Sequence, residues 1–216
     1  MATSDKNPEL GQRQSPLAHR KTLTGDGDLA MHEAALLGKI ILRADEKLAE
    51  KSIKAAINGA SLPKAACTST NVSDSQVSIL WLGPDEWMIV CAPDGEQTII
   101  AGLEKALNGK HFQISDVSDY YTCIDISGEN SREIMMNLST LDLHPSVFKR
   151  GDIKGSVFGH ANAWLWHLST NPGQSEAFRL IIRASMADYM WCLLAKSGKC
   201  FGLPAEKPIT GEKLVV

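Results

Sequence analysis

The stretch LWLGPDEWMIV at residues 80–90 decides the fold, because its pattern is that of two strands joined by a short turn. Apolar residues that favour strands stand on each side of a Gly-Pro-Asp-Glu turn, in which Pro84 presets the φ angle and Gly83 tolerates unusual dihedral angles. Trp81 and Trp87 lie six residues apart across this turn. On paired strands their rings can pack near each other, and large aromatic side chains usually anchor a core. We therefore predict a core hairpin.

The composition is that of a globular protein and argues against two classes of partner. The chain has 216 residues, 44% hydrophobic and 22% charged, which suffices for one large domain or two small halves. The net charge is −3 and no basic cluster accompanies the few aromatic residues, so we expect no nucleic-acid partner. No apolar stretch is long enough to span a bilayer, and the N-terminus lacks the apolar region of a signal peptide. We expect a cytoplasmic protein that does not contact membranes.

No group of residues has the spacing of a catalytic, cofactor or metal site. The five cysteines are odd in number and lack a C-x-x-C pair, which argues against disulfides and zinc and favours reduced core thiols. Gly102 and Gly109 have the wrong spacing for a P-loop, and no G-x-G-x-x-G follows a strand. The histidines are scattered, and His160 and His167 would point to opposite faces of a predicted strand. We therefore assign no catalytic, cofactor-binding or metal-binding residue.

Two further groups have both a functional and a structural interpretation. Asp116 and Asp119 can tune each other's pKa, but the segment 116–119 also has the residue types that turns require, and we favour the turn. Three tryptophans and a tyrosine can line an apolar ligand pocket or, more simply, pack strand against helix. Any of these aromatic residues that stays exposed at the surface would indicate a protein interface. The set is Trp164, Trp166, Tyr189 and Trp191.

The first part of the chain predicts a flexible tail followed by strand, helix, hairpin and helix. Residues 1–28 are polar without an apolar period and form the tail, with one apolar spot at 15–18 that can dock on another surface. The other elements predicted here are a buried strand at 30–43, a helix at 45–57, a loop at 68–75 and a helix at 94–108.

The second part predicts the same order again. Its elements are a strand at 120–127, a helix from Gly128 to about 139, strands at 157–168 and 177–183 with a turn at 170–173, a helix at 185–196, and a surface tail at 202–216. Strand, helix, strand, strand, helix, strand is the order of a ferredoxin-like split β-α-β unit. We predict an α+β fold with mixed or antiparallel sheets. One domain at 29–201 has halves at about 29–115 and 116–201 that share a continuous sheet or a core.

Several motifs, in their joint order, resemble the gamma subunit family of heterotetrameric sarcosine oxidase. The most specific are LWLGPDEW at 80–87 and Asp142-Leu-His-Pro-Ser-Val-Phe148, similar to the family pattern DLHPxxF. The others are Ser15-Pro-Leu17, Ile41-Leu-Arg43, Leu62-Pro63, Asp116-Val-Ser118, Gly128 and Arg183-Ala-Ser-Met-Ala-Asp-Tyr189, where Ala184 stands as an extra residue. The resemblance covers most of the chain after about residue 15.

The resemblance implies a fold and also marks one departure from it. The wider group is the folate-binding fold of glycine-cleavage aminomethyltransferases, which agrees with the duplicated α+β pattern. Where aminomethyltransferases carry a glycine-rich strand with an acidic pair used in folate chemistry, this chain has GHANAWLW at 159–166, without an aspartate. A carboxylate suited to a pterin is replaced by bulky apolar rings, which argues against folate catalysis by this chain.

By this resemblance the chain is a non-catalytic structural subunit with alpha, beta and delta partners. The assembled enzyme is expected to oxidise sarcosine to glycine, with peroxide formation and transfer of the one-carbon unit to tetrahydrofolate or release of formaldehyde. FAD, FMN, NAD, tetrahydrofolate and zinc would belong to the other subunits. The residues that the resemblance offers as interface or structural candidates are Trp81, Gly83, Pro84, Asp85, Glu86, Trp87, Asp116, Ser118, Asp142, Pro145 and Phe148.

Two other classes of function stay open. One is a stand-alone folate-binding or folate-dependent one-carbon protein of the same fold. The other is a module that acts on iron–sulfur proteins through a reactive loop cysteine, for which Cys67 is the candidate. The sequence also leaves open which faces contact which subunit and whether the complex prefers another N-methyl amino acid.

Overall fold

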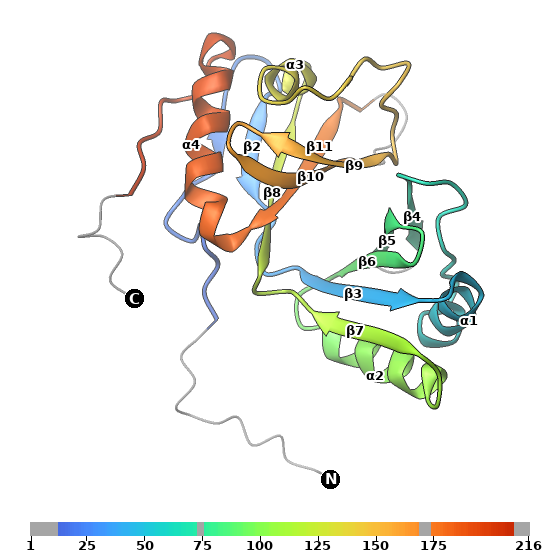
Figure 1. Ribbon diagram of the computed structural model, residues 1–216. Helices are drawn as coiled ribbons and strands as arrows, with labels where there is room; N and C mark the ends of the chain where they lie inside the picture. Colours follow the sequence, from blue (N-terminus) through green and yellow to red (C-terminus); the bar gives the residue numbers. More distant parts are fainter. Residues whose placement is uncertain (1–12, 73–75, 169–173, 210–216) are drawn as a thin grey trace.

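The computed structural model describes residues 13–72, 76–168 and 174–209, and its chain forms two antiparallel sheets with helices on their outer sides (Figure 1). The five-stranded sheet has the order β4-β5-β6-β3-β7. Its strands are β3 (Gly38–Ala44), β4 (Ser69–Val72), β5 (Val77–Gly83), β6 (Glu86–Cys91) and β7 (Phe112–Asp116). Its helices are α1 (Glu46–Ala56) and α2 (Glu96–Leu107), which pack against each other.

The six-stranded sheet has the order β1-β2-β8-β11-β10-β9. Its strands are β1 (Leu23–Thr24), β2 (Ala30–Glu33), β8 (Tyr121–Ser127), β9 (Ile153–Phe158), β10 (Ala161–His167) and β11 (Ala177–Arg183). Its helices are α3 (Ser131–Met136) and α4 (Ala187–Ser197), with short 3-10 turns at Ala184–Met186 and Gly198–Phe201.

Local sequence explains why α1 begins and which side it buries. Asp45 caps the helix, because its carboxylate accepts hydrogen bonds from the backbone N–H groups of Lys47 at 3.0 Å and Leu48 at 3.4 Å. The buried residues Ala49 and Ile53 lie four apart on one face, toward the sheet. The structure thus confirms the helix expected at 45–57.

Both halves have the strand order of a split β-α-β unit, as predicted. In the first half the order is β5-β6-β3-β7, with α1 and α2 as the two crossovers. In the second half the corresponding order is β10-β11-β8-β2. Its fourth strand is therefore β2, which comes from the N-terminal end of the chain and pairs Met31 with Ile126. The second unit is completed by a strand from before the first unit.

The single strand predicted at 30–43 is wrong, because this segment contains two strands that belong to different sheets. β2 joins the six-stranded sheet and β3 the five-stranded sheet. The turn between them includes Leu36 at a φ of 57°, a conformation that glycine adopts more readily than leucine. Neither glycine nor proline marks this turn, so the continuous apolar pattern concealed it.

The N-terminal segment from residue 13 onward contacts the domain, whereas the sequence predicted a flexible tail to residue 28. Leu17 is 1% exposed and lies in the core of the six-stranded sheet. Leu23 pairs with Met31 in β1 and β2. The apolar spot predicted at 15–18 thus docks on its own chain, and short segments of this kind carry too few apolar residues to show a period.

Three other boundaries differ from the prediction. Residues Ser69–Val72, predicted as loop, form the edge strand β4, where polar side chains are tolerated because one edge faces solvent. The segment predicted as one strand at 157–168 contains the end of β9, a turn at Gly159 with a φ of 57°, and β10. The helix predicted through about 139 ends at Met136. The turn predicted at 170–173 lies outside the described residues.

The core has three parts, and the middle part joins the two halves. One lies between the five-stranded sheet and α1 and α2, and another between the six-stranded sheet and α3 and α4. The third, here called the inter-sheet core, lies between the inner faces of the two sheets. It consists of Leu80, Met88 and Val90 from one sheet and Cys123, Ile153, Trp166 and Ile181 from the other. The two halves therefore share a core and not a continuous sheet.

Candidate functional site

The hairpin of β5 and β6 lies between two parts of the core. Successive side chains of its strands point alternately to the helices α1 and α2 and to the inter-sheet core. Trp81 and Trp87 are direct cross-strand partners and face α1 and α2, which confirms the predicted hairpin. Trp87 is 1% exposed, and its indole N–H has no hydrogen-bond partner among the described residues. Leu80 and Met88 face the inter-sheet core. The two tryptophans thus act in packing within the chain.

The turn of this hairpin is exposed and forms ion pairs with Arg43 of β3. Pro84 and Asp85 are exposed, while Gly83 and Glu86 are half-buried. The guanidinium of Arg43 donates to Asp85 at 2.9 Å and lies 3.9 Å from the carboxylate of Glu86. Contact of this turn with another subunit stays a prediction.

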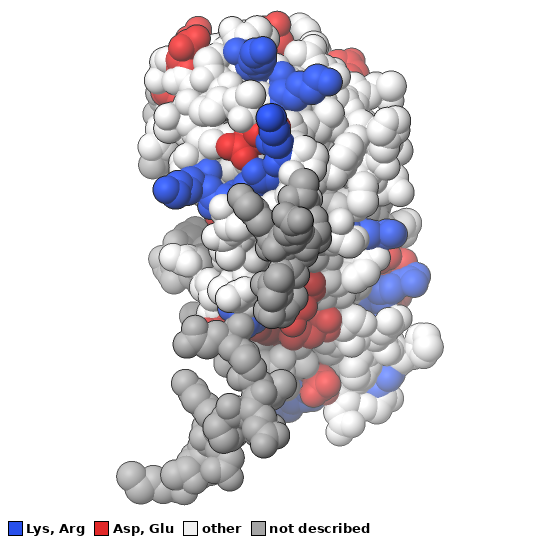
Figure 2. Space-filling model, turned by 90° about the vertical axis from the view of Figure 1, so that its left-hand side faces the viewer, with Lys and Arg blue, Asp and Glu red and all other residues white. Residues whose placement is uncertain are grey.

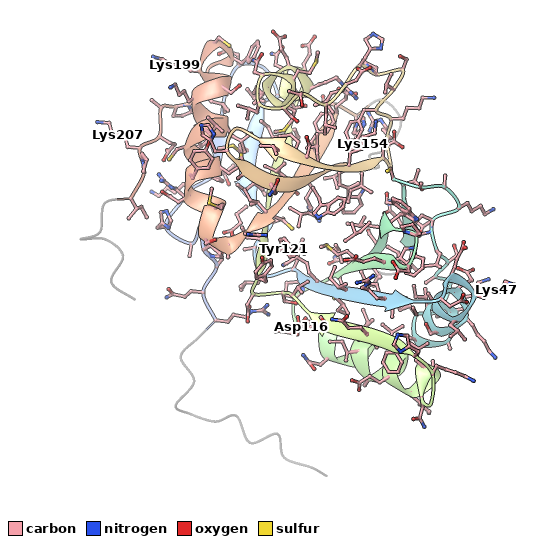
Figure 3. The ribbon with its side chains drawn as sticks, in the orientation of Figure 1. Lys47, Asp116, Tyr121, Lys154, Lys199 and Lys207 are labelled. Atoms are coloured by element: carbon pink, nitrogen blue, oxygen red, sulfur yellow. The ribbon has the colours of Figure 1, made fainter. Side chains whose placement is uncertain are left out.

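Asp116 and Ser118 join the end of β7 to the start of β3. The carboxylate of Asp116, labelled in Figure 3, accepts from Gln97 at 3.0 Å and from the backbone N–H of Ser118 at 3.0 Å. The buried hydroxyl of Ser118 accepts from the backbone N–H of Lys39 at 2.9 Å. These contacts are those of a turn, and they engage Asp116 away from Asp119, which pairs with Arg13 at 2.7 Å.

The DLHPSVF segment is positioned by Arg132 of α3. Its guanidinium donates to the carbonyls of Leu143 and Phe148, the latter at 3.2 Å, and it holds the carboxylate of Glu176. Phe148 is fully buried, whereas Asp142 and Pro145 are exposed. Asp142 accepts from the backbone N–H of His144 at 3.0 Å and closes the turn. Arg132 was not predicted from the sequence, because nothing near it indicates a buried partner.

A buried histidine lies beside this arginine. His167 is 2% exposed, with its ring stacked at 4.5 Å from Phe178 and its Nε2 atom 3.7 Å from a carboxylate oxygen of Glu176. Burial and the neighbouring guanidinium of Arg132 hold the pKa of His167 below its usual value of 6.5, although Glu176 acts in the opposite direction. The pKa of Glu176 is lowered as well, mainly by its hydrogen bond from Arg132.

This histidine predicts acid sensitivity of the fold. Because the pKa of His167 is lower in the folded chain, the unfolded chain takes up the proton first, and unfolding is favoured as the pH falls through about 6.5. We expect the free energy of unfolding to fall between about pH 7.5 and pH 5, and His167→Phe to flatten this dependence. Urea titrations across the range measure it. The exposed His160 replaced by Gln is the control, and equal slopes for all three proteins would contradict the assignment.

An ion pair lies on the inner face of the six-stranded sheet. Arg179 donates to both carboxylate oxygens of its cross-strand partner Asp125, each at 2.7 Å. The guanidinium also lies 5.7 Å from the ring centre of Trp166, whose indole N–H donates to Ser69 at 2.9 Å. The pair is a structural link between β8, β11 and the inter-sheet core.

The inter-sheet core is open at one end, where a hollow of about 480 Å³ lies on the six-stranded sheet. Tyr121 and Trp164 lie half-buried against the inter-sheet core and also line this hollow. Arg183, the cross-strand partner of Tyr121, and Val157 are further lining residues. Tyr121 is labelled in Figure 3, where it lies at the junction of the two halves. We call these four residues with Tyr120 and Asn162 the junction surface.

The predicted packing of the tryptophan set is wrong in one respect. Trp164 and Trp166 share a strand face, as expected, but this face points toward the five-stranded sheet. Trp191 of α4 is 1% exposed and packs on the opposite face with Leu165. A period of two assigns residues to a common face but does not show which layer covers it. The set is divided between two parts of the core and does not line one pocket.

The possible metal ligands and the thiols are scattered over the described ranges 13–72, 76–168 and 174–209. Among these residues no three His, Cys, Asp or Glu side chains gather as a metal site. The cysteines in these ranges are unpaired thiols, and the pKa of the buried Cys123 is raised by burial to about 11. Cys67, the loop candidate, is half-buried at a φ of 59°, and its carbonyl accepts from Ile153 at 2.9 Å. In the same ranges, no helix has the length and apolar character needed to cross a membrane.

The fold assigns this chain to a structural class but does not identify a particular family. The fold resembles that of the solved structure of glycine cleavage system aminomethyltransferase T from Bartonella henselae. That structure is similar to this chain with a TM-score of 0.57 at 12% sequence identity, over 76% of this chain and 44% of that chain. At this identity the likeness concerns the fold alone. The chain has the α+β fold of the aminomethyltransferase folate-binding domains, as the sequence indicated.

The particular family follows from the sequence. The model of the sarcosine oxidase, gamma subunit family matches residues 44–199. Sarcosine oxidase subunit gamma from Arthrobacter sp. is 27% identical over 171 residues, which are 77% of this chain and 82% of that protein. The solved heterotetrameric sarcosine oxidase from Corynebacterium sp. U-96, in complex with pyrrole 2-carboxylate, contains a chain with a TM-score of 0.76 and 22% identity, over 90% of this chain and 98% of that one. The chain belongs to the sarcosine oxidase gamma subunit family.

Proposed function

We propose that this chain is the non-catalytic structural gamma subunit of a heterotetrameric sarcosine oxidase. The complex would oxidatively demethylate sarcosine to glycine, with peroxide formation and with transfer of the one-carbon unit to tetrahydrofolate or release of formaldehyde. The observation that carries the proposal is the family match over residues 44–199, which spans both halves of the fold. The similarity to a chain of a solved heterotetramer, over 98% of that chain, supports it.

The partners in this proposal are alpha, beta and delta subunits, and the site of assembly is the cytoplasm. FAD, FMN, NAD, tetrahydrofolate and zinc would be bound by those subunits. The residues present do not fit a folate at the strand where the fold suggests one, because β10 presents Asn162, Trp164 and Trp166 on its inner face. A pterin is held by carboxylate hydrogen bonds, and an indole offers only a single donor. The proposal therefore assigns no folate step to this chain.

Co-expression tests the proposal. We expect the full chain, tagged and expressed with the candidate large flavoprotein, beta and delta subunits, to bring down a flavin-containing complex that forms peroxide when sarcosine is added. Omission of this chain alone is expected to reduce the yield of intact complex. A chain that stays alone and binds tetrahydrofolate in a titration would overturn the proposal and favour the stand-alone folate protein.

A second outcome concerns the catalytic role. Neutralising exposed acids of this chain, Asp85→Asn and Asp116→Asn, is expected to leave kcat per assembled flavin unchanged, since a structural subunit supplies no reacting group. A loss of kcat in a fully assembled complex would show that the chain takes part in the reaction. The yield of complex, measured separately by flavin absorbance, distinguishes assembly from turnover.

A further inference from the structure

We propose that the junction surface is the docking site for a segment of a larger subunit that presents an apolar side chain to Trp164 and a carboxylate to Arg183. The proposal rests on the proposed function, because it names the chemistry of the partner in that assembly. Nothing in the family match says which face of the chain is covered. The packing, exposure and charge of the junction surface itself indicate this site.

The junction surface continues a core that the chain leaves unfinished. Alternation along β8, β10 and β11 places Tyr121, Trp164 and Arg183 on the same inner face as Cys123, Trp166 and Ile181. Leu80, Met88 and Val90 of the other sheet cover the latter set. Beyond them, Tyr121 and Trp164 are only half-buried, and Val157 at the margin is 50% exposed. An obligate interface resembles a domain core cut in half, and this face has that form.

The hollow has room for a side chain from outside, and its floor is aromatic. A Cβ atom placed on Gly155 would lie 2.9 Å from the Trp164 ring, so the ring lies directly over this glycine. Only glycine lets the indole lie flat on the strand, where it lines the hollow of about 480 Å³. Tyr120, which is 49% exposed, stands edge-on to Tyr121 at 4.7 Å. Tyr, Trp and Arg are the residue types enriched at the centres of protein interfaces.

The positive charge of Arg183 on the junction surface indicates that the partner places an acidic side chain opposite it. Arg183 is exposed, and within the described part of the chain no carboxylate lies within ion-pair distance of it. Its guanidinium lies over the ring of Tyr120, 5.6 Å from the ring centre. The nearby acids Asp119 and Glu86 are engaged by Arg13 and Arg43. A guanidinium covered by a partner needs a carboxylate to offset its desolvation, and the proposal assigns that group to the other chain.

Another hollow provides a matched control surface. It has about 640 Å³ and lies along α4 and residues 205–208, with Lys199 on its rim. Figure 2 shows basic side chains gathered on this side of the molecule around a small acidic area, and Figure 3 labels Lys199 there. The carboxylates of Asp188 and Glu206 in this hollow are held by Arg20 of the same chain. Lys199 is exposed like Arg183, so reversing either charge changes the net charge equally.

The test compares the full-length chain carrying Arg183→Glu with the full-length chain carrying Lys199→Glu. We expect Arg183→Glu to weaken binding of the chain to the purified larger subunits at least tenfold in an immobilised-chain binding assay, and Lys199→Glu to leave it within twofold. Trp164→Ala is expected to weaken binding similarly but without the salt dependence of the Arg183 contact. Because Arg183 forms no ion pair within the described chain, its variant is expected to keep the wild-type melting temperature.

Each outcome is decisive. Wild-type affinity of Arg183→Glu, with wild-type assembly intact, would overturn the docking site. A loss confined to Lys199→Glu would overturn it in favour of the α4 side. Failure of the wild-type chain to assemble would instead refute the proposed function, so the two failures are distinguishable. A carboxylate-to-lysine variant of the partner that restores binding to Arg183→Glu would identify the contacting residue.

Discussion

Replacement of Asp125 by Ala is expected to lower the free energy of unfolding by about 3–5 kcal/mol, because it leaves Arg179 buried between the sheets without its carboxylate. The two side chains are 8% and 17% exposed and are joined by two hydrogen bonds of 2.7 Å. The loss is the cost of an uncompensated buried charge, which exceeds what the intact pair contributes. Urea denaturation of the purified full-length chain measures it.

Two controls separate this effect from a general loss of charge. Asp85→Ala removes the carboxylate of an exposed pair, in which Arg43 and Asp85 are 48% and 56% exposed, and is expected to cost no more than about 1 kcal/mol. The double variant Asp125→Leu with Arg179→Met removes both buried charges and is expected to be more stable than Asp125→Ala. If the double variant is the least stable protein, the pair itself is stabilising and the explanation by an unpaired charge is wrong.

Trp87→Ala is expected to cost about 3–5 kcal/mol, since it removes one of the largest fully buried side chains and leaves a cavity that the sheet and helices cannot close. Its cross-strand partner Trp81 is half-buried, so Trp81→Ala is expected to cost clearly less. The two substitutions therefore compare the loss of stability at a fully buried and at a half-buried position of the same cross-strand pair.

Thermal and urea unfolding of both variants measure this difference. If Trp87→Ala does not fold, Trp87→Phe keeps most of the apolar volume and is expected to remain folded with a smaller loss. The unfolding of the Phe variant also shows whether the indole N–H matters, because that group has no hydrogen-bond partner among the described residues. Equal losses for Trp81→Ala and Trp87→Ala would contradict the assignment of Trp87 to the core.

Much of the fold could be predicted from local patterns, because turns and the hydrophobic periods of helices and strands depend on residues that are close in the sequence. The turn of the hairpin at Pro84, the helix after Asp45 and the strand at 177–183 were placed within a residue or two. The turn at Leu36 was missed because its positive φ is imposed by the two sheets it connects, not by a glycine. Tertiary packing outweighed local preference there.

The site was less predictable than the fold for a physical reason. The partial exposure of Trp164, and the lack of an ion pair at Arg183 among the described residues, depend on strand register and on which layer covers each face. Neither follows from the order of residues along the chain. The family motifs contain buried or turn-forming residues such as Trp87 and Ser118. Residues of this kind contribute to the fold. Their contact with other subunits stays a prediction.

The position of β2 has a consequence for synthesis on the ribosome. Met31 pairs with Ile126, so a strand made early must wait for a partner that emerges almost one hundred residues later. During that interval the first α+β unit can close by itself, whereas β2 and the buried Leu17 have no sheet to join. Such distant pairing slows folding and leaves an unpaired strand and the apolar side chains of Leu17 and Met31 available to other chains. Delayed closure of the second unit would favour assembly partners that are already present when translation ends.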